Sequence, residues 1–294
     1  MMITLQNNGM TAHISLTGAE LKSLRDSAGN EMLWPGDPNG WERSSPLLFP
    51  IVSNTRNKKL TIKGKEYDMP NHGVVRNLPW EVEQPSPDRA VFSIHQNEET
   101  LAHYPYLFSL TAAYTLLPKG IRLELTVQNP NDEPMPYCIG THPGLKVPFE
   151  SSKGSDFSDY SLLFDQPERQ DCPLYNFKER QIDIDNRETF LSDPQTFHLD
   201  HGIFNRVDSV ILDDLRSRKV TLRDNKTGEA VEYRLQNFSD LCIWNMMNAK
   251  FLCVEAWQGL SVLDTEDNTL EHKHNVVTLV PGASGTHLLE IEKV

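Results

Sequence analysis

Hydrophobic and polar residues alternate with a period of two over much of the chain. Residues 121–128 alternate without interruption, which is the pattern of a strand with one buried face. The same alternation begins near the N-terminus, at Ile3, Leu5 and Ala12. It also predicts strands at 60–62, 66–67, 89–95, 108–117, 208–212, 220–223, 230–235, 251–256, 275–280 and 285–292.

Helical periodicity is scarce by contrast. One short helix is predicted at 97–103, capped by Asn97 and ended before Pro105. Residues 151–160 are interpreted as a polar surface loop, and residues 165–200, where the pattern is weakest, as an extended excursion. Many short strands separated by turn residues indicate an all-β sandwich or barrel with little helix. Strand patterns on both sides of the weak stretches match in character, so we expect a single domain, 1–294.

Acidic residues outnumber basic ones, 41 against 28, which gives a net charge of −13. Such a surface repels nucleic acid and anionic membranes, so neither is expected as a partner. A neutral small molecule fits better, although a local arginine cluster could bind a phosphorylated one. The N-terminus lacks the pattern of a signal peptide, and no stretch approaches the about 20 apolar residues of a membrane span. We therefore expect a cytoplasmic protein.

Metal-binding spacings are weak in this chain. The four cysteines show no C-x-x-C pair and are expected to be buried, reduced thiols. His272 and His274 share one face of an extended stretch, but no carboxylate or cysteine stands at a supporting spacing. Asp183 and Asp185 alternate without the glycine or further ligands of a calcium loop. We expect no metal and no organic cofactor.

Glu255 lies in the apolar segment Phe251–Trp257, where a carboxylate is unexpected. By alternation it shares a face with Cys253 and Trp257. A buried carboxylate is costly unless it is paired or hydrogen-bonded, and burial raises its pKa towards the range of a general base. The residues alone leave two interpretations open, a catalytic base and a structural ion pair.

His142 follows an apolar strand and precedes Pro143, which biases the histidine towards an extended backbone. This rigidity suits a side chain that must be aimed, but it also suits a histidine that satisfies a turn carbonyl. A third polar group comprises His72 and Arg76, together with Asn54 and Arg56 after the apolar run that ends at 52. Arginine can donate several hydrogen bonds to a sugar hydroxyl or a phosphate.

Five segments in order resemble the aldose 1-epimerase (galactose mutarotase-like) superfamily over nearly the whole chain. Within it the chain is most similar to the bacterial branch that includes a lactose-operon-associated, mutarotase-like protein of lactococci. The segments are Gly18–Leu24, Ser45–Pro50, His72–Arg76, Gly140–Pro143 and Cys253–Gly259.

This resemblance implies a large antiparallel β-sandwich with a sugar on its concave face. It also implies that Glu255 is the general base, that His142 is the general acid, and that His72 and an arginine bind the sugar. A substrate-binding aspartate precedes a late strand in such enzymes; Asp208 matches best, with Asp200 as the alternative. Trp257 beside the glutamate is the tryptophan expected to stack on the sugar.

The chain departs from the family pattern at three positions. Asn54 stands where the family has an arginine, which Arg56 or Arg76 could replace. Ala256 follows the glutamate in place of proline. Gly144 replaces an aromatic residue, and we expect this change to open space in the pocket.

The predicted function is an isomerase, an aldose 1-epimerase that interconverts the α and β anomers of a hexose in carbohydrate metabolism. One alternative is a hexose 6-phosphate 1-epimerase, with Arg56, Arg76 and Lys58 around the phosphate. Another is a non-catalytic carbohydrate-binding protein, which the change at Asn54 would explain. A polysaccharide lyase or hydrolase fits less well, because hydrolysis usually needs two carboxylates and only Glu255 stands out. We expect a monomer or a homodimer.

Overall fold

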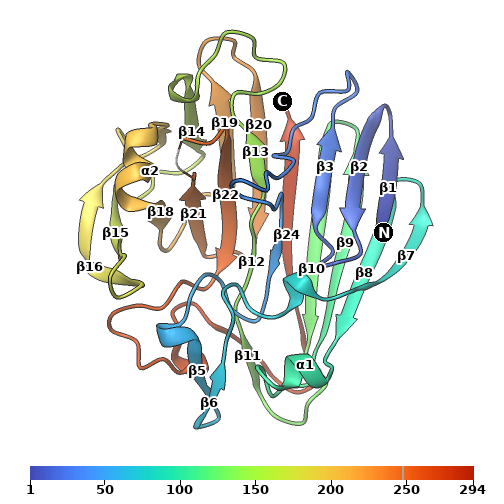
Figure 1. Ribbon diagram of the computed structural model, residues 1–294, viewed down its shortest axis with the longest axis vertical. Helices are drawn as coiled ribbons and strands as arrows, with labels where there is room; N and C mark the ends of the chain where they lie inside the picture. The colour runs from blue at the N-terminus through green and yellow to red at the C-terminus, as the bar shows by residue number, and fades with distance from the viewer. Residues whose placement is uncertain (247) are drawn as a thin grey trace.

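The computed structural model describes residues 1–246 and 248–294, and antiparallel sheets dominate it (Figure 1). The largest sheet has nine strands. In hydrogen-bonded order they are β17 (Thr196–His198), β14 (Tyr160–Phe164), β19 (Lys219–Asp224), β20 (Ala230–Gln236), β24 (Ser284–Lys293), β10 (Gly120–Gln128), β9 (Ser109–Leu117), β8 (Arg89–His95) and β7 (Glu81–Ser86).

A six-stranded sheet carries the polar residues of interest. Its strands are β18 (Ser209–Leu212), β21 (Asp240–Trp244), β22 (Phe251–Gln258), β12 (Ile139–Thr141) and β4 (Leu47–Leu48), with β13 (Gly144–Lys146) paired to β22. Strand β22 is central, because β21 pairs on one side of it and β12 and β13 pair on the other.

Smaller sheets surround these two. They are β1 (Met2–Asn7), β2 (Met10–Ser15) and β3 (Leu21–Arg25); the hairpin of β5 (Lys59–Ile62) and β6 (Lys65–Asp68); the pair β11 (Met135–Tyr137) and β23 (Val277–Leu279); and the hairpin of β15 (Asp171–Asn176) and β16 (Gln181–Thr189). Figure 1 shows this last hairpin at the edge of the molecule.

Helices are short, as the sequence predicts. They are α1 (Glu98–Leu101), α2 (His201–Val207) and the 3-10 turns Arg56–Lys58, Val75–Asn77, Phe157–Asp159 and Leu270–His272. Asn97 caps α1 through a reciprocal capping box with Thr100, which confirms the predicted start of that helix. In the part of the chain described, no helix is long and apolar enough to cross a membrane.

The two large sheets enclose one apolar core, so the protein is a large antiparallel β-sandwich. Leu123 and Leu222 of the nine-stranded sheet and Val254 of the six-stranded sheet belong to the same buried cluster. Strand β10 alternates buried and exposed side chains for most of its length, because one face meets this core and the other meets solvent. Strand β22 is buried along almost its whole length instead.

The predicted strands are confirmed with small shifts at their ends, but the excursion at 165–200 is more ordered than its pattern indicates. Strands β15 and β16 pair there as a hairpin whose register shifts between Pro173 and Leu174. This irregularity interrupts the alternation and explains why the pattern is weak. The hairpin contacts β18, and α2 follows it after β17.

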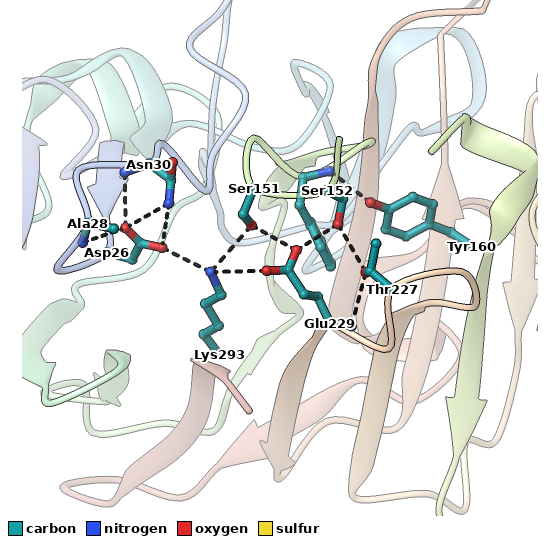
Figure 2. Close-up of polar contacts among 10 residues, drawn as sticks. Asp26, Ala28, Asn30, Ser151, Ser152, Tyr160, Thr227, Glu229 and Lys293 are labelled. Atoms are coloured by element: carbon teal, nitrogen blue, oxygen red, sulfur yellow. Dashed lines mark hydrogen bonds and ion pairs between the residues drawn. The ribbon is translucent and has the colours of Figure 1, made fainter. Parts of the chain in front are cut away.

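A polar network ties the first sheet to the last strand (Figure 2). Lys293 Nζ donates to Asp26 Oδ2 at 3.0 Å and lies 3.9 Å from Glu229 Oε1. Glu229 Oε2 accepts hydrogen bonds from Ser151 and Ser152 at 2.9 and 2.7 Å. Charged groups in this network therefore meet opposite charges or hydroxyl donors.

Candidate active site

A cavity of about 310 Å³ lies against β21 and β22 and draws its walls from distant parts of the chain. Its lining combines aromatic rings with carboxylates and histidines, which is typical of a small-molecule site. The lining residues are Trp41, Ser53, Asn54, His72, His142, Asp208, Ser209, Cys242, Trp244, Glu255 and Trp257.

His142 and Glu255 meet at the wall of this cavity, with His142 Nε2 3.3 Å from Glu255 Oε1. Glu255 is on β22 opposite Cys242 of β21, and His142 lies between β12 and β13. Main-chain hydrogen bonds to Pro46 and from Val254 hold the histidine segment on either side. The sequence motifs at 142 and 255 are thus brought together by sheet pairing.

The pair is held in surroundings that disfavour charge. Burial raises the pKa of Glu255 well above its ordinary value, and the neighbouring Asp208 adds to the shift. Burial lowers the pKa of His142 to about 3. Among the described residues, neither Glu255 Oε2 nor His142 Nδ1 has a hydrogen-bond partner. Buried polar atoms without partners are costly, so these two are available to a ligand.

Trp41 and Trp244 surround the imidazole of His142. The Trp41 ring stacks on it with centroids 4.9 Å apart, and Trp244 approaches it edge-on at 5.6 Å. Neither tryptophan was among the lining residues predicted from sequence. The apolar run of β21, at 241–244, was the available signal for Trp244, but no local pattern predicts that Trp41 lines the cavity.

Gly144 does not open space in the pocket, contrary to the expectation from sequence. A Cβ atom at Gly144 would lie 2.6 Å from Cζ3 of Trp41. The indole of Trp41 therefore fills the volume that a larger side chain at 144 would occupy. A segment about a hundred residues earlier in the chain thus supplies an aromatic ring at this place.

His72 enters the cavity on a strained turn. Its φ of 62° is in the left-handed region, which is unfavourable for a residue with a side chain. The backbone N–H of Ser53 donates to His72 Nδ1 at 3.1 Å, and burial lowers the pKa of His72 well below its ordinary value. The ring is therefore neutral with its proton on Nε2, which makes it a hydrogen-bond donor.

Gly73 permits that turn. It has a φ of 76°, and a Cβ there would lie 2.0 Å from the carbonyl oxygen of Phe49. Only glycine allows the two chain segments to approach this closely. The His72-Gly73 pair in the sequence is thus a local signal that the structure explains.

Asp208 also lines the cavity, whereas Asp200 caps α2 by accepting from the N–H of Gly202. Trp244 Nε1 donates to Asp208 Oδ1 at 3.2 Å, and burial raises the pKa of Asp208. Trp257 lines the cavity beside it. Of the two aspartates considered from sequence, the structure brings Asp208 to the pair.

The two arginines predicted to bind the sugar, Arg56 and Arg76, do not line this cavity. Arg56 directs its guanidinium to the carbonyl oxygen of Leu263 at 3.1 Å, and Arg76 lines a separate depression with Lys58. Arg76 is still close enough for its charge to lower the pKa of His72 and His142, although burial is the larger cause. Asn54 lies at the cavity wall itself, and its Oδ1 is buried without a partner among the described residues.

Within the described residues, two groups of side chains bring possible metal-ligand atoms within 4.8 Å of one another. The first is His142, Cys253 and Glu255, but burial raises the pKa of the Cys253 thiol well above its ordinary value, so the thiolate that a metal needs is disfavoured. The second is His274 with Asp214 and Asp240. The two aspartates are far from His274 in the sequence and come close to it only in the folded chain, so no sequence spacing predicts this group. Both oxygens of Asp240 already accept hydrogen bonds.

An antiparallel β-sandwich with this cavity defines a protein of the galactose mutarotase-like fold. A galactose mutarotase-related enzyme from Lactobacillus acidophilus superposes with a TM-score of 0.91 at 30% identity, covering 100% of this chain and 97% of that one. A galactose mutarotase-like protein from Lactobacillus casei gives a TM-score of 0.90 at 28% identity and covers 100% of both chains.

The sequence comparison is more specific. The sequence model of the family "Aldose 1-epimerase" matches residues 1–279, and the chain belongs to this family. The plasmid-encoded protein LacX of Lactococcus lactis subsp. lactis is 35% identical over 288 residues, covering 96% of this chain and 95% of that protein.

Proposed function

We propose that the protein is an aldose 1-epimerase that interconverts the α and β anomers of a free hexose. The contact of His142 with Glu255 at the cavity wall carries this proposal, because it joins an acid and a base that the local structure leaves short of partners. Membership of the family and the names of similar proteins support the same reaction.

In the proposed reaction, the Glu255 carboxylate accepts the proton of the C1 hydroxyl while the His142 imidazolium donates a proton to the ring oxygen. The bond between C1 and the ring oxygen breaks and leaves an open-chain aldehyde. Rotation about the C1–C2 bond presents the other face of the carbonyl, and the two proton transfers run in reverse on closure. Atoms and protons balance without an oxidant or a second substrate.

The environment of the pair suits this exchange. Burial raises the pKa of Glu255 and lowers that of His142 to about 3, so desolvation favours the uncharged form of the pair over the charged form. Ring opening converts the charged pair into this uncharged pair. The same desolvation that makes the charged state costly therefore helps the ring to open.

His72 and Asp208 are proposed to bind the sugar hydroxyls. The Nε2 proton of His72 can be donated, and Asp208 can accept or donate according to its protonation. Trp257 and Trp41 supply flat apolar faces that match the C–H faces of a pyranose. Arg56 and Arg76 lie outside the cavity lining, which favours an unphosphorylated hexose over a hexose 6-phosphate.

Polarimetry tests the proposal with freshly dissolved α-glucose, α-galactose and glucose 6-phosphate. We expect acceleration with at least one free hexose, loss of about 10²–10⁴-fold in kcat in Glu255→Gln, and a comparable loss in His142→Asn. Sugar binding without acceleration would instead make the protein a non-catalytic carbohydrate binder. Acceleration confined to glucose 6-phosphate would overturn the choice of substrate.

A further inference from the structure

The cavity that holds the acid/base pair adjoins a second hollow. This hollow has a volume of about 460 Å³, and the hairpin of β15 and β16 forms its outer side through Tyr175, Phe177 and Arg180. The two hollows share a boundary made of five residues. They are Ser53, Asn54, Asp208, Ser209 and Trp257.

The acid/base pair lies on the inner side of this boundary. His142 and Glu255 line the inner cavity, and the outer hollow is lined by other residues. In a pyranose, C1 and the ring oxygen lie on one edge, and C3 and C4 lie on the opposite edge. A sugar whose C1 and ring oxygen face the pair therefore presents C3 and C4 towards the outer hollow.

The outer side of this hollow carries the kinds of side chain that bind sugars, namely aromatic rings and an arginine. The Phe177 ring is 55% exposed, and the Tyr175 ring meets it edge-on with centroids 5.5 Å apart. An aromatic face in this position can cover the C–H face of a second pyranose. The Arg180 side chain is exposed and forms no ion pair within the described part of the chain, so its donors are free for hydroxyl groups.

The hairpin is anchored where it meets the boundary. Ile182 donates its N–H to the carbonyl oxygen of Val262 at 2.9 Å, and Asn54 Nδ2 donates to the Tyr175 hydroxyl at 3.3 Å. Asn54 thus lies on the boundary between the two hollows and holds the hairpin beside it.

We propose that the outer hollow is a second subsite, which binds the sugar attached to C4 of the reducing hexose, so that 1→4-linked reducing disaccharides are preferred over monosaccharides. This inference rests on the proposed function for the orientation of the first ring. Phe177 is the stacking residue, Arg180 is a hydroxyl donor, and Asn54 holds Tyr175 of the hairpin at the boundary.

Binding and mutarotation are measured with glucose, with the 1→4-linked disaccharides maltose and cellobiose, and with the 1→6-linked isomaltose. Calorimetry gives Kd, and polarimetry gives kcat and KM. We expect at least one 1→4-linked disaccharide to bind more tightly than glucose and isomaltose. Phe177→Ala and Arg180→Ala should each raise the Kd for that disaccharide by about threefold to tenfold. Both variants should keep the Kd for glucose within about twofold of the wild-type value. Leu107→Ala, which removes an exposed apolar side chain elsewhere, is the matched control and should change neither.

The outcomes separate the two proposals. If glucose and the 1→4-linked disaccharides bind alike, or if Phe177→Ala affects both equally, the second subsite is overturned while the epimerase stands. If no sugar mutarotates but the preference for a 1→4-linked disaccharide depends on Phe177, the reaction is overturned and the subsite stands. An effect of Arg180→Ala confined to glucose 6-phosphate would identify an anion site and overturn the second-sugar assignment.

Discussion

Two polar regions of this protein treat their charges in opposite ways. In the network around Lys293, both Asp26 and Glu229 accept several hydrogen bonds as well as facing the ammonium group (Figure 2). In the cavity, Glu255 and His142 are more deeply buried yet each keeps an atom without a partner among the residues described. The carboxylates with several partners lie where strands are joined. The buried groups that lack partners lie where a ligand can enter.

The pKa values record the same contrast. Burial alone would raise the pKa of Asp26, but hydrogen bonds from Asn30 and Lys293 outweigh it and the pKa is lowered. At Glu255 burial dominates and the pKa is raised. The Asp26 carboxylate is kept ionised by its partners, whereas the raised pKa of Glu255 suits the proton exchange proposed for it.

The largest effect is expected when the same substitution, Glu to Gln, is made in each region and the two variants are compared. Glu255→Gln removes the proposed base, and we expect kcat to fall by about 10²–10⁴-fold. Glu229→Gln should leave kcat unchanged and lower the free energy of unfolding by at most about 1 kcal/mol, because it weakens exposed and half-buried contacts. Polarimetry and urea denaturation of both variants give the comparison.

Stability at neutral pH provides an independent readout of these variants. A carboxyl group whose folded pKa is raised destabilises the protein increasingly as the pH rises from its unfolded value towards its folded value. Glu255→Gln removes this penalty and should be at least as stable as the wild type at pH 7. A clear loss of stability in Glu255→Gln would mean that Glu255 is a structural ion-pair partner and that the contrast between the regions is wrong.

The pH dependence of kcat is the next largest effect. Activity requires the pair to hold one proton, so it should fall about tenfold per pH unit above the raised pKa of Glu255. It should also fall in acid as His142 takes a second proton, near its pKa of about 3. Arg76 and Arg43 contribute to that low value. Because the Asp208 charge raises the pKa of Glu255, Asp208→Asn should move the alkaline limb to lower pH; an unmoved limb would assign it to another group.

A smaller effect is expected at Gly144. Gly144→Ala places a methyl group against Trp41, and overpacking of this kind costs about 1–3 kcal/mol. Since Trp41 stacks on His142, kcat/KM should fall as well. Combining the change with Trp41→Phe should restore part of the lost stability, as expected for residues in contact. Additive losses in the double variant would show that the two positions do not share this space.

The smallest effect is expected at Lys293. Lys293→Met should lower the free energy of unfolding by about 1 kcal/mol at neutral pH. The contribution from a lowered pKa is present above the unfolded pKa of Asp26 and disappears as the pH falls through the folded value. The difference between wild type and variant should therefore shrink below the ordinary value of 3.8. Denaturation at a series of pH values tests this, and a constant difference would leave Asp26 out of the effect.

Much of the fold follows from local pattern because burial of one sheet face imposes alternation. Residues 89–95 and 121–128 match β8 and β10 closely for this reason. The hairpin of β15 and β16 could not be predicted, because its register shift breaks the period and neither face is uniformly buried. Helix α2 was missed as well, since a seven-residue helix is too short to show periodicity.

The site was predictable where a polar residue lies in an apolar setting. Glu255 stood out on that ground, and His142 and His72 stood out by their local sequence. The resemblance assigned roles to these three residues and added Asp208. The place of Trp41 in the cavity could not be predicted, because it depends on the space beside Gly144, a contact across the fold. The placement of Arg56 could not be predicted either. The sequence does not show whether its guanidinium binds a carbonyl oxygen of the protein or a sugar.

Two buried thiols lie beside Glu255. Cys242 faces it from β21, and Cys253 precedes it by two residues on β22. Burial, and then the proximity of Glu255, raises the pKa of both well above the ordinary value. Thiolates add readily to aldehydes, and the proposed reaction exposes an aldehyde in the cavity that Cys242 lines. By keeping the sulfur atoms protonated, the fold would protect the proposed open-chain intermediate from capture as a hemithioacetal. The proposed base would thus also restrain the nucleophiles beside it.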